Sequence, residues 1–80
     1  MPLTSHARLV IRALLRRRRG VSDMHLLADT RLAGPELNRL LLGLENRGLL
    51  YTDVDARAGE RLWWPSAASA HALDATDTPD

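Results

Sequence analysis

The chain has 80 residues, which is the size of one small domain. It contains no cysteine, so neither a disulfide framework nor a thiolate metal site is available. It has no run of about 18 apolar residues that could span a bilayer. The N-terminus lacks the charged start and long apolar block of a secretion signal. These features argue against a disulfide scaffold and a membrane protein, and we expect a cytoplasmic protein.

The charge is divided unevenly along the chain. All eleven basic residues are arginines, and they lie between Arg8 and Arg61. Residues 1–65 carry seven acidic side chains, so their net charge is +4, whereas the last fifteen residues contain three aspartates and no arginine. A modest basic excess permits nucleic-acid binding without requiring it. Each guanidinium is a planar fork that suits phosphate and guanine.

A first helix is predicted over about residues 4–18. Thr4 or Ser5 can cap its start, because a side-chain oxygen there accepts a free amide of the first turn. Gly20 marks its end. The residues that recur at the spacing of one apolar helix face are Ala7, Val10, Ile11, Leu14 and Leu15.

Two more helices follow. Ser22 is a good N-cap for a short second helix, and residues 30–34 then form a turn of the length found in helix-turn-helix motifs. The third helix is predicted from about Pro35 to Arg47, because proline suits a first turn and Gly48 is a matching stop. Its inward face consists of Leu37, Leu40, Leu41 and Leu44. Its outward face consists of Pro35, Arg39, Leu42 and Asn46.

After this helix the pattern changes to that of strands. Residues 49–54 and 61–64 are β-prone and enclose a polar turn, which predicts a β-hairpin. Trp63 and Trp64 must face opposite sides of their strand, so we expect one in the core and one exposed for self-association or a partner contact. Residues 66–80 form an Ala/Asp-rich tail, in which 67–73 can add one or two helical turns before a disordered end.

The order of helix, helix, turn, helix and hairpin is that of a winged helix-turn-helix. The expected fold class is therefore mainly α with a small β-hairpin: three helices plus a two-stranded wing, over residues 1–65. The segment "GPELNRLLLGLENRGLLYTDVDARAGERLWWPS" resembles the third helix and wing of PadR-like and MarR-like bacterial transcription regulators. Those families usually carry further long helices that build a dimer, whereas this chain offers at most a short alanine-rich one. The matching residues are Leu37, Arg39, Leu41, Leu44, Glu45, Gly48, Leu49, Arg61 and Trp63 or Trp64.

The resemblance implies a regulator that binds double-stranded DNA as a homodimer, with the third helix in the major groove and the wing on the backbone or minor groove. Arg39 is the best candidate for a base contact, because a guanidinium can bond both acceptors of guanine. Asn38 would bond adenine, and Pro35 and Leu42 would touch thymine methyl groups. The candidates for the DNA backbone are Asn46, Arg57 and Arg61, and the cluster Arg16, Arg17, Arg18 and Arg19.

A winged-helix module that binds another protein is the alternative. Glu36 and Glu45 flank the outward face and would repel phosphate, and an exposed tryptophan would suit a protein contact. One continuous positive face over the third helix, the first-helix end and the wing would favour DNA, and a broken one beside an exposed tryptophan and Leu42 would favour protein. No activated nucleophile, glycine-rich phosphate loop or ligand-like histidine spacing is present. We therefore expect no enzyme activity, no cofactor and no metal.

Overall fold

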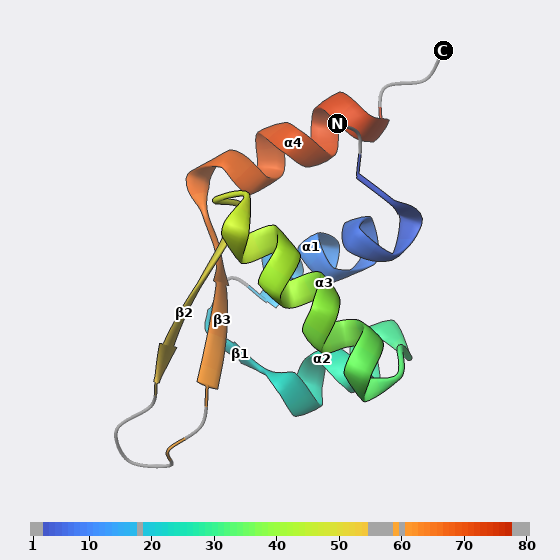
Figure 1. Cartoon of the computed structure of the whole chain (residues 1–80). Helices are drawn as coiled ribbons and strands as arrows, with labels where there is room; N and C mark the ends of the chain where they lie inside the picture. Colours follow the sequence, from blue (N-terminus) through green and yellow to red (C-terminus); the bar gives the residue numbers. More distant parts are fainter. Residues whose placement is uncertain (1–2, 18, 55–58, 60, 78–80) are drawn as a thin grey trace.

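The structure, a computed structural model, describes residues 3–17, 19–54, 59 and 61–77. Within these residues the chain forms a winged helix of four helices and a three-stranded sheet (Figure 1). The elements in chain order are α1 Ser5–Arg17, β1 Val21–Ser22, α2 Asp23–Thr30, α3 Gly34–Asn46, β2 Leu50–Val54, β3 Arg61–Pro65 and α4 Ala67–Asp77.

The core lies where α1, α2, α3 and the sheet meet. Helix α3 crosses in front of α1, and the hairpin of β2 and β3 extends to one side (Figure 1). Burying each large apolar side chain contributes about 1.5–3 kcal/mol, so the domain rests on this one cluster. Leu40, which the leucine pattern assigned to the core, is only partly buried at its edge. The fully buried residues include Val10, Ile11, Leu14, Leu26, Leu37, Leu41 and Trp63.

Side-chain caps fix where the first two helices begin. The Thr4 hydroxyl accepts the Ala7 amide at 3.1 Å, so Thr4 rather than Ser5 caps α1. The Ser22 hydroxyl accepts the His25 amide at 3.3 Å, which confirms the predicted start of α2. No side chain caps α3, whose first turn contains Pro35 as expected. The two caps therefore set the starts of α1 and α2, whereas α3 begins without a side-chain cap.

The strands form an antiparallel sheet in the order β1-β3-β2. The predicted hairpin is confirmed as β2 and β3, but β1 is an addition, because a two-residue strand leaves no alternating pattern in the sequence. Trp63 faces the core and is fully buried, whereas Trp64 faces the other side. There Trp64 lies opposite Tyr51 in the register, with the two rings stacked at 6.4 Å between centroids.

Helix α4 is longer than the tail composition predicted. Its start is held by Ser66, whose hydroxyl donates to the Gly48 carbonyl at 2.7 Å and whose amide donates to the Leu49 carbonyl at 2.9 Å. Ser69 and Leu73 are then buried as α4 packs against α1 and β3. The expected disorder of the last seven residues is therefore wrong for residues 74–77, which are helical. Among the described residues, no helix is long and apolar enough to cross a membrane.

Candidate nucleic-acid interface

The outward face of α3 is open to solvent. Pro35, Asn38, Arg39 and Asn46 are all exposed, and Leu42 keeps 48% of its surface. The face is accessible over the full length of the helix, because the burial of α3 is confined to its leucine stripe. A shallow hollow lies along its second half, lined by Leu42, Gly43, Glu45 and Asn46. The helix can therefore enter a groove or dock on a surface without rearrangement of the domain.

Arg39 lies on the α1 side of this face. It lines a hollow of about 190 Å³ together with Thr4 and Ala7 from the start of α1. Among the described residues Arg39 has no ion-pair partner. Its charge is thus uncompensated by a close neighbour, which is what a contact to a guanine or a phosphate requires.

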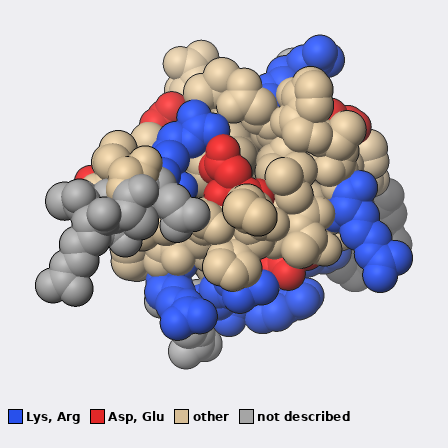
Figure 2. Space-filling view, turned by 90° about the horizontal axis from the view of Figure 1, so that it is seen from below, with Lys and Arg blue, Asp and Glu red and all other residues tan. Residues whose placement is uncertain are grey.

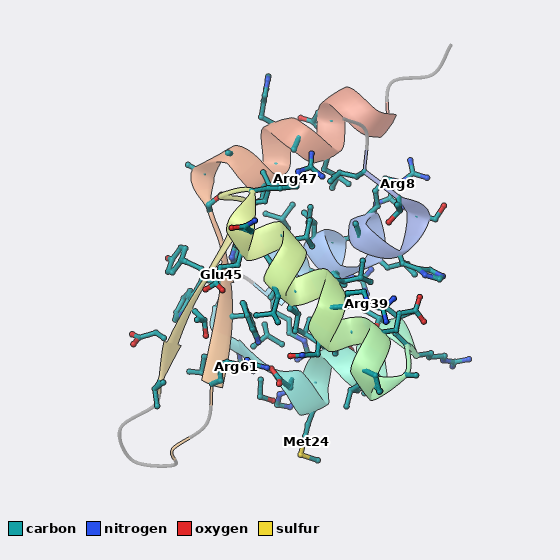
Figure 3. All side chains as sticks on the ribbon, viewed as in Figure 1. Arg8, Met24, Arg39, Glu45, Arg47 and Arg61 are labelled. Carbon is teal, nitrogen blue, oxygen red and sulfur yellow. The ribbon has the colours of Figure 1, made fainter. Side chains whose placement is uncertain are left out.

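Arg61 lies on the opposite, hairpin side of α3, where its side chain is 37% exposed and bonds to neighbouring elements (Figure 3). Its Nη2 donates to Asp23 Oδ2 at 2.7 Å and to Asn38 Oδ1 at 3.3 Å. The other oxygen of Asp23 accepts the indole N–H of Trp63 at 2.6 Å. We name these four residues, Asp23, Asn38, Arg61 and Trp63, the Asp23 cluster. It ties α2, α3 and β3 together.

The Asp23 cluster changes what the sequence predicted for Arg61. The guanidinium carbon lies 4.8 Å from the centre of the Trp63 ring, in cation–π geometry, while its charge faces Asp23. A phosphate contact by Arg61 would compete with this ion pair. Its observed contacts make it an internal tie at the root of the wing. Arg57, the other wing arginine, lies outside the described residues.

The arginine run at the end of α1 is also divided. Arg17 forms a two-pronged ion pair with Asp29 of α2, at 2.9 and 3.0 Å. This hydrogen bonding lowers the pKa of Asp29 and raises the pKa of Arg17. Arg16 and Arg19 are exposed without an ion-pair partner among the described residues, and Arg18 lies outside them. Of the three described arginines, Arg16 and Arg19 are open to a phosphate.

The positive charge does not form one continuous area on the face shown in Figure 2. Figure 2 looks at the end of the molecule where α2, the start of α3 and the end of the hairpin lie. In this view the blue surface is broken into separate areas around the rim, and red and tan surface lies between them. Asp23 and Asp29 account for part of this break, because each is paired with an arginine. The broken surface matches one part of the pattern that we associated with a protein partner, which also required an exposed tryptophan.

Two exposed residues beside α3 were missed by the sequence reasoning. Arg31 lies in the turn before α3 and ends α2 in a left-handed backbone conformation, with φ of 60°. Met24, in the first turn of α2, is 74% exposed and lines a small hollow with Asp23 and Arg61. The exposure of Arg31 could have been predicted from its position in the turn between the second and third helices. The exposure of Met24 had no signal in the sequence, since methionine is an apolar residue that is more often buried.

The aromatic side chains on the outer sheet face differ from the expectation of one exposed tryptophan. Trp64 is only partly exposed, because Tyr51 stacks on it and Gly20 lies against its ring. Tyr51 is the more open of the pair, at 52% exposure. The two rings form one apolar surface on the side of the sheet away from Trp63.

Two of the three histidines bond within the fold. His6 Nδ1 lies 2.8 Å from Glu36 and links α1 to α3, and His25 Nδ1 lies 2.9 Å from the Ser22 hydroxyl. Over the described ranges, the side chains of His, Asp and Glu do not form a group of three that could hold a metal ion.

Comparison with known proteins places this fold among solved transcription regulators. The MepR–DNA complex of S. aureus is similar with a TM-score of 0.79 and 20% identity, covering 92% of this chain and 54% of that one. A MarR-family regulator from Rhodococcus sp. RHA1 has a TM-score of 0.81 and 22% identity, covering 92% and 52%. PcaV of Streptomyces coelicolor, in complex with its natural ligand, has a TM-score of 0.82 and 21% identity, covering 89% and 50%.

These likenesses establish the winged-helix fold and its similarity to MarR-family structures. The chain spans about half the length of each of the three solved chains. No protein-family model and no curated protein matches the sequence. The PadR-like part of the sequence resemblance stays a prediction.

Proposed function

We propose that this chain is a sequence-specific DNA-binding regulator of transcription, in which α3 enters the major groove. The observation that carries the proposal is the open outward face of α3, in a fold similar to a DNA-bound regulator, with Arg39 lacking an ion-pair partner in the described part of the chain. Regulators of this architecture present the exposed residues of the recognition helix to base edges. The mechanism is occupancy of an operator, and it requires no chemical step.

The contacts divide into base reading and positioning. Arg39 reads a base, since a guanidinium bonds guanine through two acceptors, and Pro35 and Leu42 give apolar contacts to thymine methyl groups. Asn46, in the last turn of α3, holds a phosphate. Arg16, Arg19 and Arg31 are exposed and add sequence-independent attraction to the backbone. Arg57 would extend this attraction to the wing.

We further propose that the protein acts as a homodimer in the bacterial cytoplasm. A two-fold dimer binds two half-sites about one helical turn apart, which doubles the number of contacts and the length of sequence that is read. Sedimentation with and without operator DNA tests this part, because a dimer must be present on the DNA. A monomer on a single half-site would overturn it.

Selection from random duplexes tests the function itself. Purified protein is incubated with a randomised duplex pool at about 150 mM salt, where non-specific binding by phosphate contacts is weakened. We expect one sequence to be enriched over successive rounds. A selection that yields no shared sequence would contradict the proposal.

A second candidate is supported by the charge distribution. The broken positive surface in Figure 2 and the exposed Leu42 suit an adaptor that docks α3 on another protein. This reading expects no enriched DNA sequence and a partner whose binding is lost in Leu42→Asp. We expect Leu42→Asp to fold, because Leu42 lies outside the core, so a loss of binding would report on the contact itself.

A further inference from the structure

The Asp23 cluster influences which base the Asn38 amide can contact. This inference rests on the proposed function, in which α3 binds DNA. Asn38 is exposed on the hairpin side of α3, and its Oδ1 accepts from Arg61 Nη2 at 3.3 Å. A guanidinium has donors and no acceptor, so chemistry alone fixes which end of the amide faces it. The oxygen of Asn38 points to Arg61, and the NH₂ group points away from it.

Arg61 is itself held in place. Asp23 Oδ2 accepts from it at 2.7 Å, and Asp23 is anchored by the fully buried Trp63, whose indole donates to Oδ1 at 2.6 Å. The guanidinium also lies 4.8 Å from the Trp63 ring centre. Because both oxygens of Asp23 are engaged, rotating Arg61 away from Asn38 would break contacts that span α2 and β3. The hydrogen bond from Arg61 therefore favours this orientation of the Asn38 amide before any DNA is bound.

This orientation opposes the reading of adenine that asparagine usually performs. Adenine is read by two bonds at once, in which the amide oxygen accepts from the base amino group and the NH₂ donates to the ring nitrogen. Here the oxygen lies beside a guanidinium, so an incoming amino group would meet positive charge. The accessible part of Asn38 is a donor. In the major groove guanine presents two neighbouring acceptors and no donor.

We propose that Arg61 makes Asn38 a donor-only reader that selects guanine over adenine. Arg61 is then a positioning residue for specificity, and Asp23 holds it. This replaces the adenine contact that the sequence alone predicted for Asn38.

The test compares the base preferences of variants in the random-duplex selection. Wild type should enrich guanine at one position that becomes degenerate in Asn38→Ala, while the other positions keep their preference. Arg61→Met, which keeps an unbranched apolar stem and removes the guanidinium donors, should shift that position towards adenine. Enrichment of adenine by wild type at the Asn38-dependent position, or an unchanged guanine preference in Arg61→Met, would overturn the proposal.

A measurement on the DNA avoids dependence on the stability of Arg61→Met. The selected guanine is replaced by 6-thioguanine, in which sulfur, a weak hydrogen-bond acceptor, takes the place of the exocyclic oxygen that adenine lacks. Wild type should lose about two- to tenfold in affinity, as expected for one hydrogen bond, and Asn38→Ala should be insensitive. Equal sensitivity of both proteins would overturn the assignment to Asn38 while leaving DNA binding intact. Failure to select any sequence would remove the proposed function and this inference together.

Discussion

Gly20 packs so closely against the side chains of β3 that a larger residue does not fit there. A methyl group built on it would come within 2.9 Å of two ring carbons of Trp64 and 3.1 Å of Leu62 Cβ. The ring of Trp64 is itself stacked on Tyr51, so it has little room to retreat. Gly43, by contrast, lies in the middle of α3 with open space around it. Packing therefore requires glycine at position 20, whereas a larger residue would fit at position 43.

Gly20→Ala and Gly43→Ala form a matched pair that tests this reading. Gly20→Ala should destabilise the domain by about 1–3 kcal/mol through overpacking. Gly43→Ala should stabilise it by about 0.5–1 kcal/mol, because alanine is the better helix former. Both are measured by denaturant unfolding. Equal effects of the two substitutions would contradict the packing role of Gly20.

Arg31 is the described residue other than glycine whose backbone is left-handed, with φ of 60°. Such a conformation costs an L-residue about 1–2 kcal/mol, and glycine usually takes this position at a helix end. Arg31→Gly should therefore raise the midpoint of thermal unfolding, while Arg31→Ala, which keeps the strained backbone, should not. If Arg31 contacts DNA as proposed, both variants should bind more weakly. A lower midpoint for Arg31→Gly than for Arg31→Ala would contradict the strain argument.

At the scale of elements, polar ties join the helices outside the apolar core. Arg17 and Asp29 join α1 to α2, His6 and Glu36 join α1 to α3, and the Asp23 cluster joins α2, α3 and β3. These ties decide which arginines remain open to a partner.

The Arg17–Asp29 tie predicts an acid-dependent loss of stability. Arg17 lowers the pKa of Asp29 below its ordinary value of 3.8 in the folded state. The stabilisation is therefore present above the ordinary value and is lost as pH falls through the lowered pKa. Thermal unfolding at about pH 7 and about pH 3 should show a smaller drop for Asp29→Asn than for wild type. Identical drops would show that this pair contributes nothing to acid sensitivity.

The sequence predicted elements better than it predicted contacts between them. Periodicity and caps located α1, α2, α3 and the hairpin to within a residue or two. The two-residue β1 and the full length of α4 were missed, because they depend on pairing with β3 and on packing against α1. The engagement of Arg61 with Asp23, 38 positions away in the chain, had no local signal at all. The helical period of the sequence predicted that the outward face of α3 is exposed. It did not predict which arginines around α3 are paired with carboxylates.

At the scale of the whole molecule, the fold and the charge pattern favour different partners. The winged helix is similar to solved regulators of transcription, one of them bound to DNA. The positive surface charge is modest and divided, because Arg17 and Arg61 form ion pairs with Asp29 and Asp23 of the same chain. We expect a DNA-binding protein that relies on few phosphate contacts. Its affinity should therefore fall less steeply with salt than that of a strongly basic regulator.

The central claim is that α3 reads bases through Arg39. It is tested by measuring the affinity of wild type, Arg39→Ala and Arg16→Ala for the selected duplex and for a scrambled duplex of equal length. Arg39→Ala should lose about 1–3 kcal/mol on the selected duplex and much less on the scrambled one. Arg16→Ala, an exposed arginine outside α3, should weaken both alike. Unchanged affinity of Arg39→Ala for the selected duplex, or an equal loss on both duplexes, would contradict the account.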